Sequence, residues 1–228
     1  MGDLFGSMFK AFDAGGIGMY PISIALIFSI AIVVERVYTL YFRSSVDKEA
    51  FLKGLRKHIY AGELDRAIAY CGGQKPSPLV SVVKAGLINV PKGEGDVQAA
   101  MDEAALRESP RIERRTGYLA MISNVATLLG LLGTIIGLIH SFGAVANANP
   151  ADKATILAQG ISEAMFCTAF GLSVAIPTLI LYSVLQGRTQ SMVDDINESS
   201  VSVLNLIVAN RDKMKLPVAG PAAAAEAE

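Results

Sequence analysis

Two long apolar segments, separated by a short loop, constrain this chain more than any other feature. They cover residues 118–142 and 161–185, and residues 143–160 join them. Each segment exceeds the roughly 20 apolar residues that cross the hydrocarbon core of a bilayer. We therefore predict a pair of antiparallel transmembrane helices at this place.

A third apolar segment, residues 17–42, completes the predicted membrane part. It begins too late and runs too long for a secretory signal, and it lacks a basic leader and a small-residue cleavage site. We interpret it as a retained transmembrane helix. Three spans place the two termini on opposite sides of the bilayer. The expected fold class is an all-α membrane protein with three transmembrane helices and a helical cytoplasmic domain.

The Lys and Arg residues indicate the orientation. Thirteen of them lie in residues 43–117, against Lys10 alone in residues 1–16 and Lys153 alone in the short loop. By the positive-inside rule, the large loop and the C-terminus are cytoplasmic and the N-terminus is outside. The predicted parts are an outer amphipathic arm (1–16), spans 17–42, 118–142 and 161–185, a cytoplasmic helical domain (43–117), an outer loop (143–160), a cytoplasmic helix extension (186–215) and a disordered tail (216–228).

Composition excludes several functional classes. Of 228 residues 52% are hydrophobic, and 20 Lys and Arg stand against 21 Asp and Glu, so no basic excess suits nucleic acid. Cys71 lies in a polar region and Cys167 in an apolar one, which indicates neither a disulfide nor a metal site. His58 and His140 fall on opposite sides of the membrane. We predict no catalytic cluster, no cofactor and no enzyme, and the lipid bilayer as one partner.

The outer arm and the cytoplasmic region both carry helical patterns. In the arm, Phe5, Phe9 and Phe12 recur at helical spacing, which predicts an amphipathic turn or two at the interface. In the cytoplasmic region, apolar residues recur every four residues at Phe51, Leu55 and Ile59, which predicts a helix. Further along the chain, a second predicted helix ends at Gly72–Gly73.

A longer cytoplasmic helix is predicted to begin near Asp96 and to continue into the second span, with Pro110 kinking or dividing it. After the third span, the helix is expected to continue with an apolar stripe that suits helices packed in a ring. The stripe consists of Val193, Ile196, Ser200, Val203 and Ile207.

Small and hydroxylated residues form one continuous face on each of the last two spans. The spacing is 4, 3, 4, 3, 4 on the second span and 3, 4, 3, 4 on the third. Such a face either packs against another helix or lines a hydrated path, and the pattern leaves both interpretations open. The two sets are Ser123, Thr127, Gly130, Thr134, Gly137 and Ser141, and Thr168, Gly171, Ala175, Thr178 and Tyr182.

Several polar residues of the two spans lie at matching predicted depths in the bilayer. At 1.5 Å per residue, Thr134 and Thr168 both lie about 12 Å from the predicted outer ends of their spans. Glu163 and His140 share a level nearer the surface. Because Glu163 lies about 140° from Thr168 around the helix, it is expected to face the second span or a neighbouring subunit. The candidate path residues are Thr134, Thr168, Glu163, Thr127, Ser123 and Thr178.

Glu35 and Arg36 end the first span. As adjacent residues they point about 100° apart, so we expect them not to pair face to face. They are interpreted as a helix anchor or as partners of a neighbouring subunit, with a transport role as the alternative.

Three stretches carry a resemblance to a known family. They are Glu35–Arg36, the segment SPRIERRTGYLAMISNVATLLGLLGTIIGLIHSF, and the segment ISEAMFCTAFGLSVAIPTLILYSVL. Together with the three-span layout they resemble the MotA/TolQ/ExbB proton channel family, in its TolQ/ExbB branch. The family's pore threonines match Thr134 and Thr168, and its third-span glutamate matches Glu163. Thr127 departs from the pattern, because the family often has Pro there.

The resemblance implies a homopentamer in the bacterial inner membrane, with two copies of a single-span TolR/ExbD-like partner inside the ring. The partner would carry the protonatable intramembrane Asp. The implied function is a stator that couples the proton motive force to a periplasmic machine through a force-transducing protein, in TonB-type uptake, Tol-type envelope maintenance or gliding motility. The alternative is a non-conducting membrane scaffold.

Overall fold

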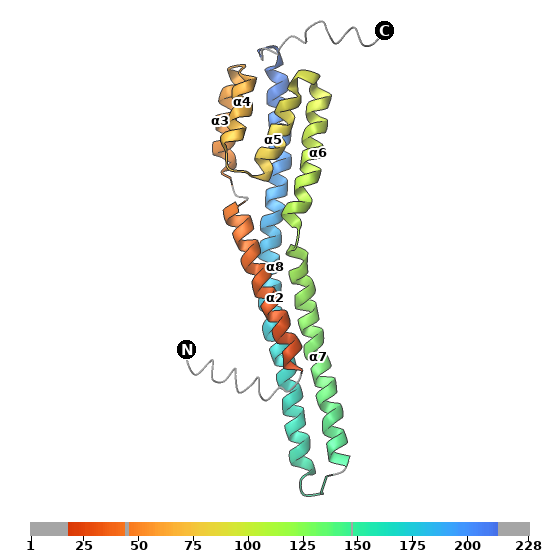
Figure 1. Ribbon diagram of the computed structural model, residues 1–228. Helices are drawn as coiled ribbons and strands as arrows, with labels where there is room; N and C mark the ends of the chain where they lie inside the picture. The colour runs from red at the N-terminus through yellow and green to blue at the C-terminus, as the bar shows by residue number, and fades with distance from the viewer. Residues whose placement is uncertain (1–17, 44–45, 147, 214–228) are drawn as a thin grey trace, which may run out of the picture. The chain divides into compact units, whose positions relative to one another are not determined.

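The protein is described by a computed structural model that covers residues 18–43, 46–146 and 148–213. Within these ranges the chain is helical and has no strand, which confirms the all-α prediction (Figure 1). Three helical stretches are long and apolar enough to cross a membrane, as predicted. The predicted amphipathic arm and the predicted tail lie outside the described residues. The chain divides into two compact units, which are described separately below.

The first unit comprises residues 1–37 and 115–186. Its described helices are α2 (Met19–Val37), α7 (Thr116–Ala146) and the first part of α8 (Lys153–Ala209). Both α7 and α8 extend into the predicted outer loop, so that only residues 147–152 separate them. The loop was predicted to begin and end where the apolar segments stop. Apolarity marks only the part of a helix that contacts lipid, and the ends of α7 and α8 beyond it, which contain Ala and Gln, remain helical.

Small residues allow the helices of the first unit to approach closely. A β-carbon on Gly171 would lie 2.8 Å from the Ala126 carbonyl oxygen, and one on Gly130 would lie 3.3 Å from the Thr168 Cα. Any larger residue at these two positions would push α7 and α8 apart. The buried core around this crossing consists of Met19, Ile22, Ala126, Cys167, Val174 and Ala175.

The second unit comprises residues 38–114 and 187–228. It contains a π-helical turn (Tyr38–Arg43), α3 (Lys48–Tyr60), α4 (Leu64–Gly73), α5 (Pro78–Asn89), α6 (Glu94–Glu113), the rest of α8, and 3-10 turns at Val90–Lys92 and Arg211–Lys213. The Asp47 carboxylate caps α3 by accepting from the Ala50 N–H, and the Ser77 hydroxyl caps α5 by accepting from the Val80 N–H.

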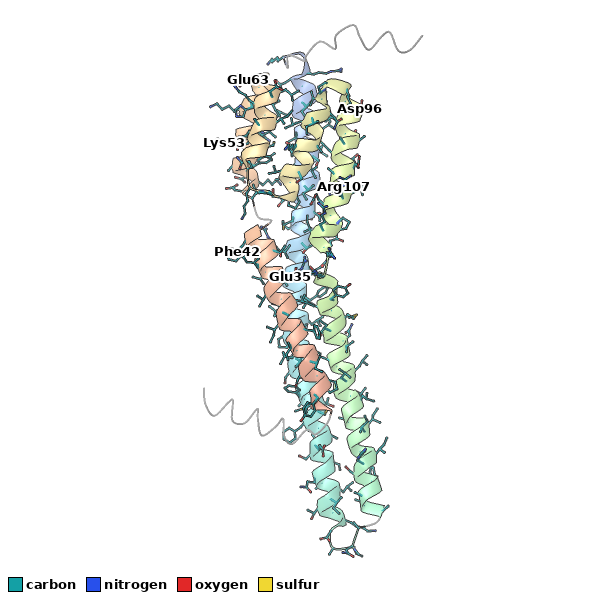
Figure 2. All side chains as sticks on the ribbon, viewed as in Figure 1. Glu35, Phe42, Lys53, Glu63, Asp96 and Arg107 are labelled. Atoms are coloured by element: carbon teal, nitrogen blue, oxygen red, sulfur yellow. The ribbon has the colours of Figure 1, made fainter. Side chains whose placement is uncertain are left out.

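The core of the second unit is apolar. The predicted α3 stripe of Phe51, Leu55 and Ile59 is buried, and α4 ends at Gly73 as expected. Charged side chains cover the outside of the same helices, with Lys53 on α3 and Arg107 on α6 both exposed (Figure 2). This is the arrangement of a water-exposed helical domain.

The prediction that the long cytoplasmic helix continues into the second span, with Pro110 kinking or dividing it, is wrong. Pro110 lies within α6, in its last turn, and the helix ends at Glu113. The break falls at Arg114 and Arg115, where Arg115 has a left-handed φ of 70°. Pro110 removes one backbone donor without ending the helix, whereas the extended backbone of Arg114 and the left-handed backbone of Arg115 stop the helical hydrogen bonding.

The C-terminal stripe on α8 is also used differently from the prediction. Ile196, Val203 and Ile207 are 2–3% exposed within the single chain. They contribute to the core of the second unit, so they are not free to pack neighbouring helices in a ring. The helix ends at Ala209, before the predicted boundary at residue 215.

Candidate functional site

Several residues of the two small faces lie in the packed interface between α7 and α8. The buried Ser123 hydroxyl donates to the Ala175 carbonyl at 2.8 Å, and the Thr168 hydroxyl donates to the Gly130 carbonyl at 3.1 Å. Gly130 itself is buried against the backbone of α8. Within one chain, the packing interpretation therefore describes these residues.

Thr127 and Thr134 belong to the same sequence pattern but point differently. Thr127 is exposed and donates to the Ser123 carbonyl of its own helix at 3.1 Å. Thr134 is half-buried and donates to the Leu131 carbonyl at 2.6 Å. Their hydroxyl oxygens can still accept hydrogen bonds. The predicted face of α7 thus divides into a packed side and an open edge that carries these two threonines.

The helix register decides how near Thr134 lies to Thr168. Gly130 lies opposite Thr168, and Gly137 lies opposite Ala164, whose Cβ would be 3.1 Å from an added β-carbon. By the first contact Thr168 is level with Gly130, and by the second, four residues along each helix, it is level with Gly133. Thr134 therefore lies within about one helical turn of Thr168 along α7. The two hydroxyls are close in depth.

Thr178 lies on a third surface, against α2. Its buried hydroxyl is 2.8 Å from the Ser29 hydroxyl and also donates to the Val174 carbonyl at 2.8 Å. Because a hydroxyl has one proton, Ser29 is the donor to Thr178 when both bonds form. The sequence analysis did not single out Ser29, which is one of several small residues in the apolar helix α2.

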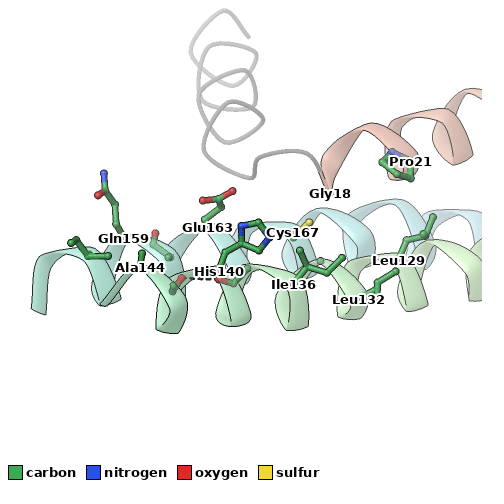
Figure 3. Close-up of a pocket in the computed structure, with 16 residues that line it drawn as sticks. Gly18, Pro21, Leu129, Leu132, Ile136, His140, Ala144, Gln159, Glu163 and Cys167 are labelled. Carbon is green, nitrogen blue, oxygen red and sulfur yellow. Dashed lines mark hydrogen bonds between the residues drawn. The ribbon is translucent and has the colours of Figure 1, made fainter. Parts of the chain in front are cut away.

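Glu163 lines a groove in the first unit, and neither Thr134 nor Thr168 does. The groove has a volume of about 750 Å³ and is bounded by the first residues of α2, the second half of α7 and the first half of α8. Glu163, Gln159 and His140 line it together, the first two from α8 and the last from α7 (Figure 3). His140 was expected at this level but was absent from the candidate path residues.

The charged end of α2 forms an ion pair within the chain. The Glu35 Oε2 atom lies 2.8 Å from Nη1 of Arg115, the residue with the left-handed backbone. Glu35 Oε1 also lies 3.5 Å from Nη2 of Arg36, which is 3% exposed. The expectation that Glu35 and Arg36 do not pair is therefore corrected. The Arg36 side chain is long enough to fold back to its neighbour, although at this length the contact is weak.

The second unit contains ion pairs and a buried thiol that suit a structural role. Lys48 Nζ lies 2.8 Å from Asp195 Oδ1 and 2.6 Å from Glu198 Oε2, and these carboxylates raise the pKa of Lys48. Burial raises the pKa of the Cys71 thiol to about 11, so it is a poor nucleophile near neutral pH. Among the residues that the structure describes, no group of three or more His, Cys, Asp or Glu could hold a metal ion.

Comparisons with known proteins match the helices that carry these residues. The profile of the MotA/TolQ/ExbB proton channel family matches residues 74–198. The biopolymer transport protein ExbB of Salmonella typhimurium is 30% identical over 180 residues, covering 73% of this chain and 72% of that protein. A protein of Methanothermobacter thermautotrophicus named as an ExbB homologue is 30% identical over 195 residues, covering 85% of this chain and 68% of that one.

The similarity to the Tol branch is higher but shorter. The Tol-Pal system protein TolQ of Haemophilus influenzae is 38% identical over 96 residues, which is 42% of each chain. The family profile takes in all of α7 and most of α8, including every candidate path residue. With that profile covering more than half of the sequence and an ExbB relative matched over most of both chains, the chain belongs to the MotA/TolQ/ExbB proton channel family.

Proposed function

We propose that this protein is the stator subunit of a proton-driven motor in the bacterial inner membrane. Five copies form a ring around two copies of a single-span partner of the TolR/ExbD kind, which carries a protonatable Asp within the membrane. The ring couples the proton motive force to mechanical work on a periplasmic or outer-membrane machine. The N-terminus is periplasmic, and the Arg-rich residues before α7 are cytoplasmic.

The observation that carries this proposal is the pair Thr134 and Thr168. They lie within about one turn of each other in depth, on two adjacent helices that also expose many large apolar side chains. Thr134 lies on the open edge of the hairpin, and Thr168 lies at its crossing point. In lipid a polar group needs a partner or a watery cavity. Facing the centre of a ring would provide that cavity, with Thr127 extending the polar edge toward the cytoplasm.

The hydroxyls serve a proton path without adding fixed charge. A proton that enters from the periplasm neutralises the partner's Asp beside the threonines and removes the desolvation cost of its charge. The partner helix then moves relative to the ring. Each charge that crosses 100 mV supplies about 2.3 kcal/mol, so a few protons per step are enough to drive rotation.

Ser123 and Thr178 support the path by holding the helices together, through the Ala175 carbonyl and Ser29 respectively. Glu163 has a separate position, in the groove with His140. We assign Glu163 to the periplasmic entrance, and Glu35 with Arg36 to anchoring the opposite end of α2 through Arg115.

Replacing both Thr134 and Thr168 with Val tests the proposal. Proton-driven work is expected to be lost while the purified complex keeps its partner and subunit number. Thr168→Ser keeps the hydroxyl and should keep activity. Ser173→Ala is the matched control, because Ser173 on α8 also bonds its own backbone, at the Ala169 carbonyl, outside the candidate set. Full activity in the double variant would refute the proposal.

The scaffold alternative has one observation in its favour, which is that the Thr168 hydroxyl is bonded to Gly130 within the chain. If the protein is a scaffold, replacing both Thr134 and Thr168 with Val should leave its activity nearly unchanged. Bulky residues at Gly133 or Gly137 do not separate the two hypotheses, because both glycines pack against α8 of the same chain. Such residues disturb the subunit itself under either function, so the threonine variants are the deciding ones.

A further inference from the structure

The groove of the first unit begins where α2 begins. Gly18 packs beside Gly133 and Cys167, and beyond this level α7 continues from Gly133 to Ala146, about 20 Å. Over this stretch no described helix takes the place of α2 against the hairpin. The groove of about 750 Å³ lies there.

The groove is amphipathic. Leu132, Ile136 and Ile156 provide apolar walls, and exposed Glu163 and His140 provide ionisable groups. A carboxylate beside a membrane-spanning apolar wall is costly unless water or protein covers it. The groove therefore suits an occupant with an apolar face and a basic side chain.

We propose that this groove is the docking site of the chain's own first residues, 1–17. The segment joins the described structure at Gly18, which itself lines the groove. From Gly133 to Ala144 the groove is about 17 Å long, and residues 1–13 would span about 20 Å as a helix. Gly15 and Gly16 give the backbone freedom to turn from α2 into the groove.

Charge and spacing agree with that placement. Phe5, Phe9 and Phe12 recur on the predicted apolar face of the segment, and Lys10 is its one basic residue. Lys10 stands six residues before Gly16, which is about 9 Å further along the groove. That is within about one turn of the level of Glu163, so the one basic side chain of the segment would lie beside the carboxylate.

Cysteine cross-linking of the full chain in membranes tests the docking, and it is independent of proton conduction. In a Cys71→Ala, Cys167→Ala background, Phe12→Cys is combined with Ile136→Cys in the groove, or with Ile135→Cys outside it. These two positions are matched, being 48% and 50% exposed on adjacent residues. Only the Ile136 pair should form an intramolecular disulfide in high yield, because a disulfide needs β-carbons about 4 Å apart.

Two further variants sharpen the result. Lys10→Glu should lower the cross-link yield several-fold, and adding Glu163→Lys should restore it. Benzoylphenylalanine in place of Phe12 in the otherwise unaltered chain should attach to groove residues of the same chain, without any cysteine replacement. Equal yields at Ile135 and Ile136, or photoattachment outside the groove, would overturn the proposal. A cross-linked dimer in place of the intramolecular product would assign the groove to a second copy instead.

Discussion

The two units of this chain expose opposite kinds of side chain. The first unit buries small and hydroxylated residues such as Ser29 and Ser123 alongside apolar ones such as Ile22, and it exposes large apolar ones such as Leu128, which is 63% exposed. The second unit buries Leu55 and exposes charges. The difference indicates the medium that each unit is built for, since apolar surface is driven inward only by water, and close packing and hydrogen bonds hold helices together in lipid.

Helix α8 shows the same difference within one element. In the first unit its exposed positions include Ile176 and Ile180, whereas in the second unit they include Asp194 and Glu198. The helical backbone is continuous from Lys153 to Ala209. The residue type at an exposed position is therefore set by the surroundings of the unit, and not by secondary structure.

The largest expected effect comes from the apolar core of the second unit. Leu55→Ala should cost about 2–5 kcal/mol, because Leu55 is 0% exposed and a cavity remains. Leu106→Ala on α6 is the matched control, since Leu106 is 76% exposed, and it should change stability by less than about 0.5 kcal/mol. Denaturant unfolding of the purified chain measures both. Equal effects would mean that this core does not stabilise the unit.

In the first unit, close approach of backbones should matter more than apolar volume. Gly171→Ala is expected to cost about 1–3 kcal/mol, because its β-carbon would meet the Ala126 carbonyl oxygen. Gly187→Ala on the same helix has open space and should gain roughly 0.5–1 kcal/mol from helix propensity. Thermal unfolding in detergent compares the two variants. A stabilising Gly171→Ala would contradict the close packing.

Hydrogen bonds between helices should contribute less. Ser29→Ala removes the bond to Thr178 and is expected to cost about 0.6 kcal/mol, with about 1.7 kcal/mol as the upper limit for such bonds in membranes. Thr178 keeps its bond to the Val174 carbonyl, which limits the loss. A double-mutant cycle of Ser29→Ala with Thr178→Val isolates the interaction. Additive effects would show that the two hydroxyls do not stabilise each other.

The smallest effect is expected at the surface of the second unit. Lys48→Met should cost about 0.2–1 kcal/mol, less at high salt, because Lys48 and its partners Asp195 and Glu198 are partly exposed. The raised pKa means that this stabilisation is present below the ordinary value of 10.5 and is lost as the pH rises through the raised value. Unfolding of both proteins between pH 8 and pH 11 measures it, and a difference that grows with pH would contradict the sign.

The sequence by itself determined the class of this protein and its main helices. Long apolar runs indicate membrane spans, and the period of Phe51, Leu55 and Ile59 indicates a buried helical face. The pair Gly72–Gly73 favours the end of a helix by its own backbone preference. These are local properties, and a single segment is enough to express them.

Only the tertiary structure decided which way each polar residue of a shared pattern faces. Spacing placed Ser123, Thr127 and Thr134 on one stripe, but the contact with α8 buries the first and leaves the other two on an open edge. Likewise, nothing local indicated that Glu35 pairs with Arg115 or Ser29 with Thr178. A helical sequence pattern specifies only the angle of each residue around its own helix axis. Packing over the whole unit decides which neighbouring helix lies on that side.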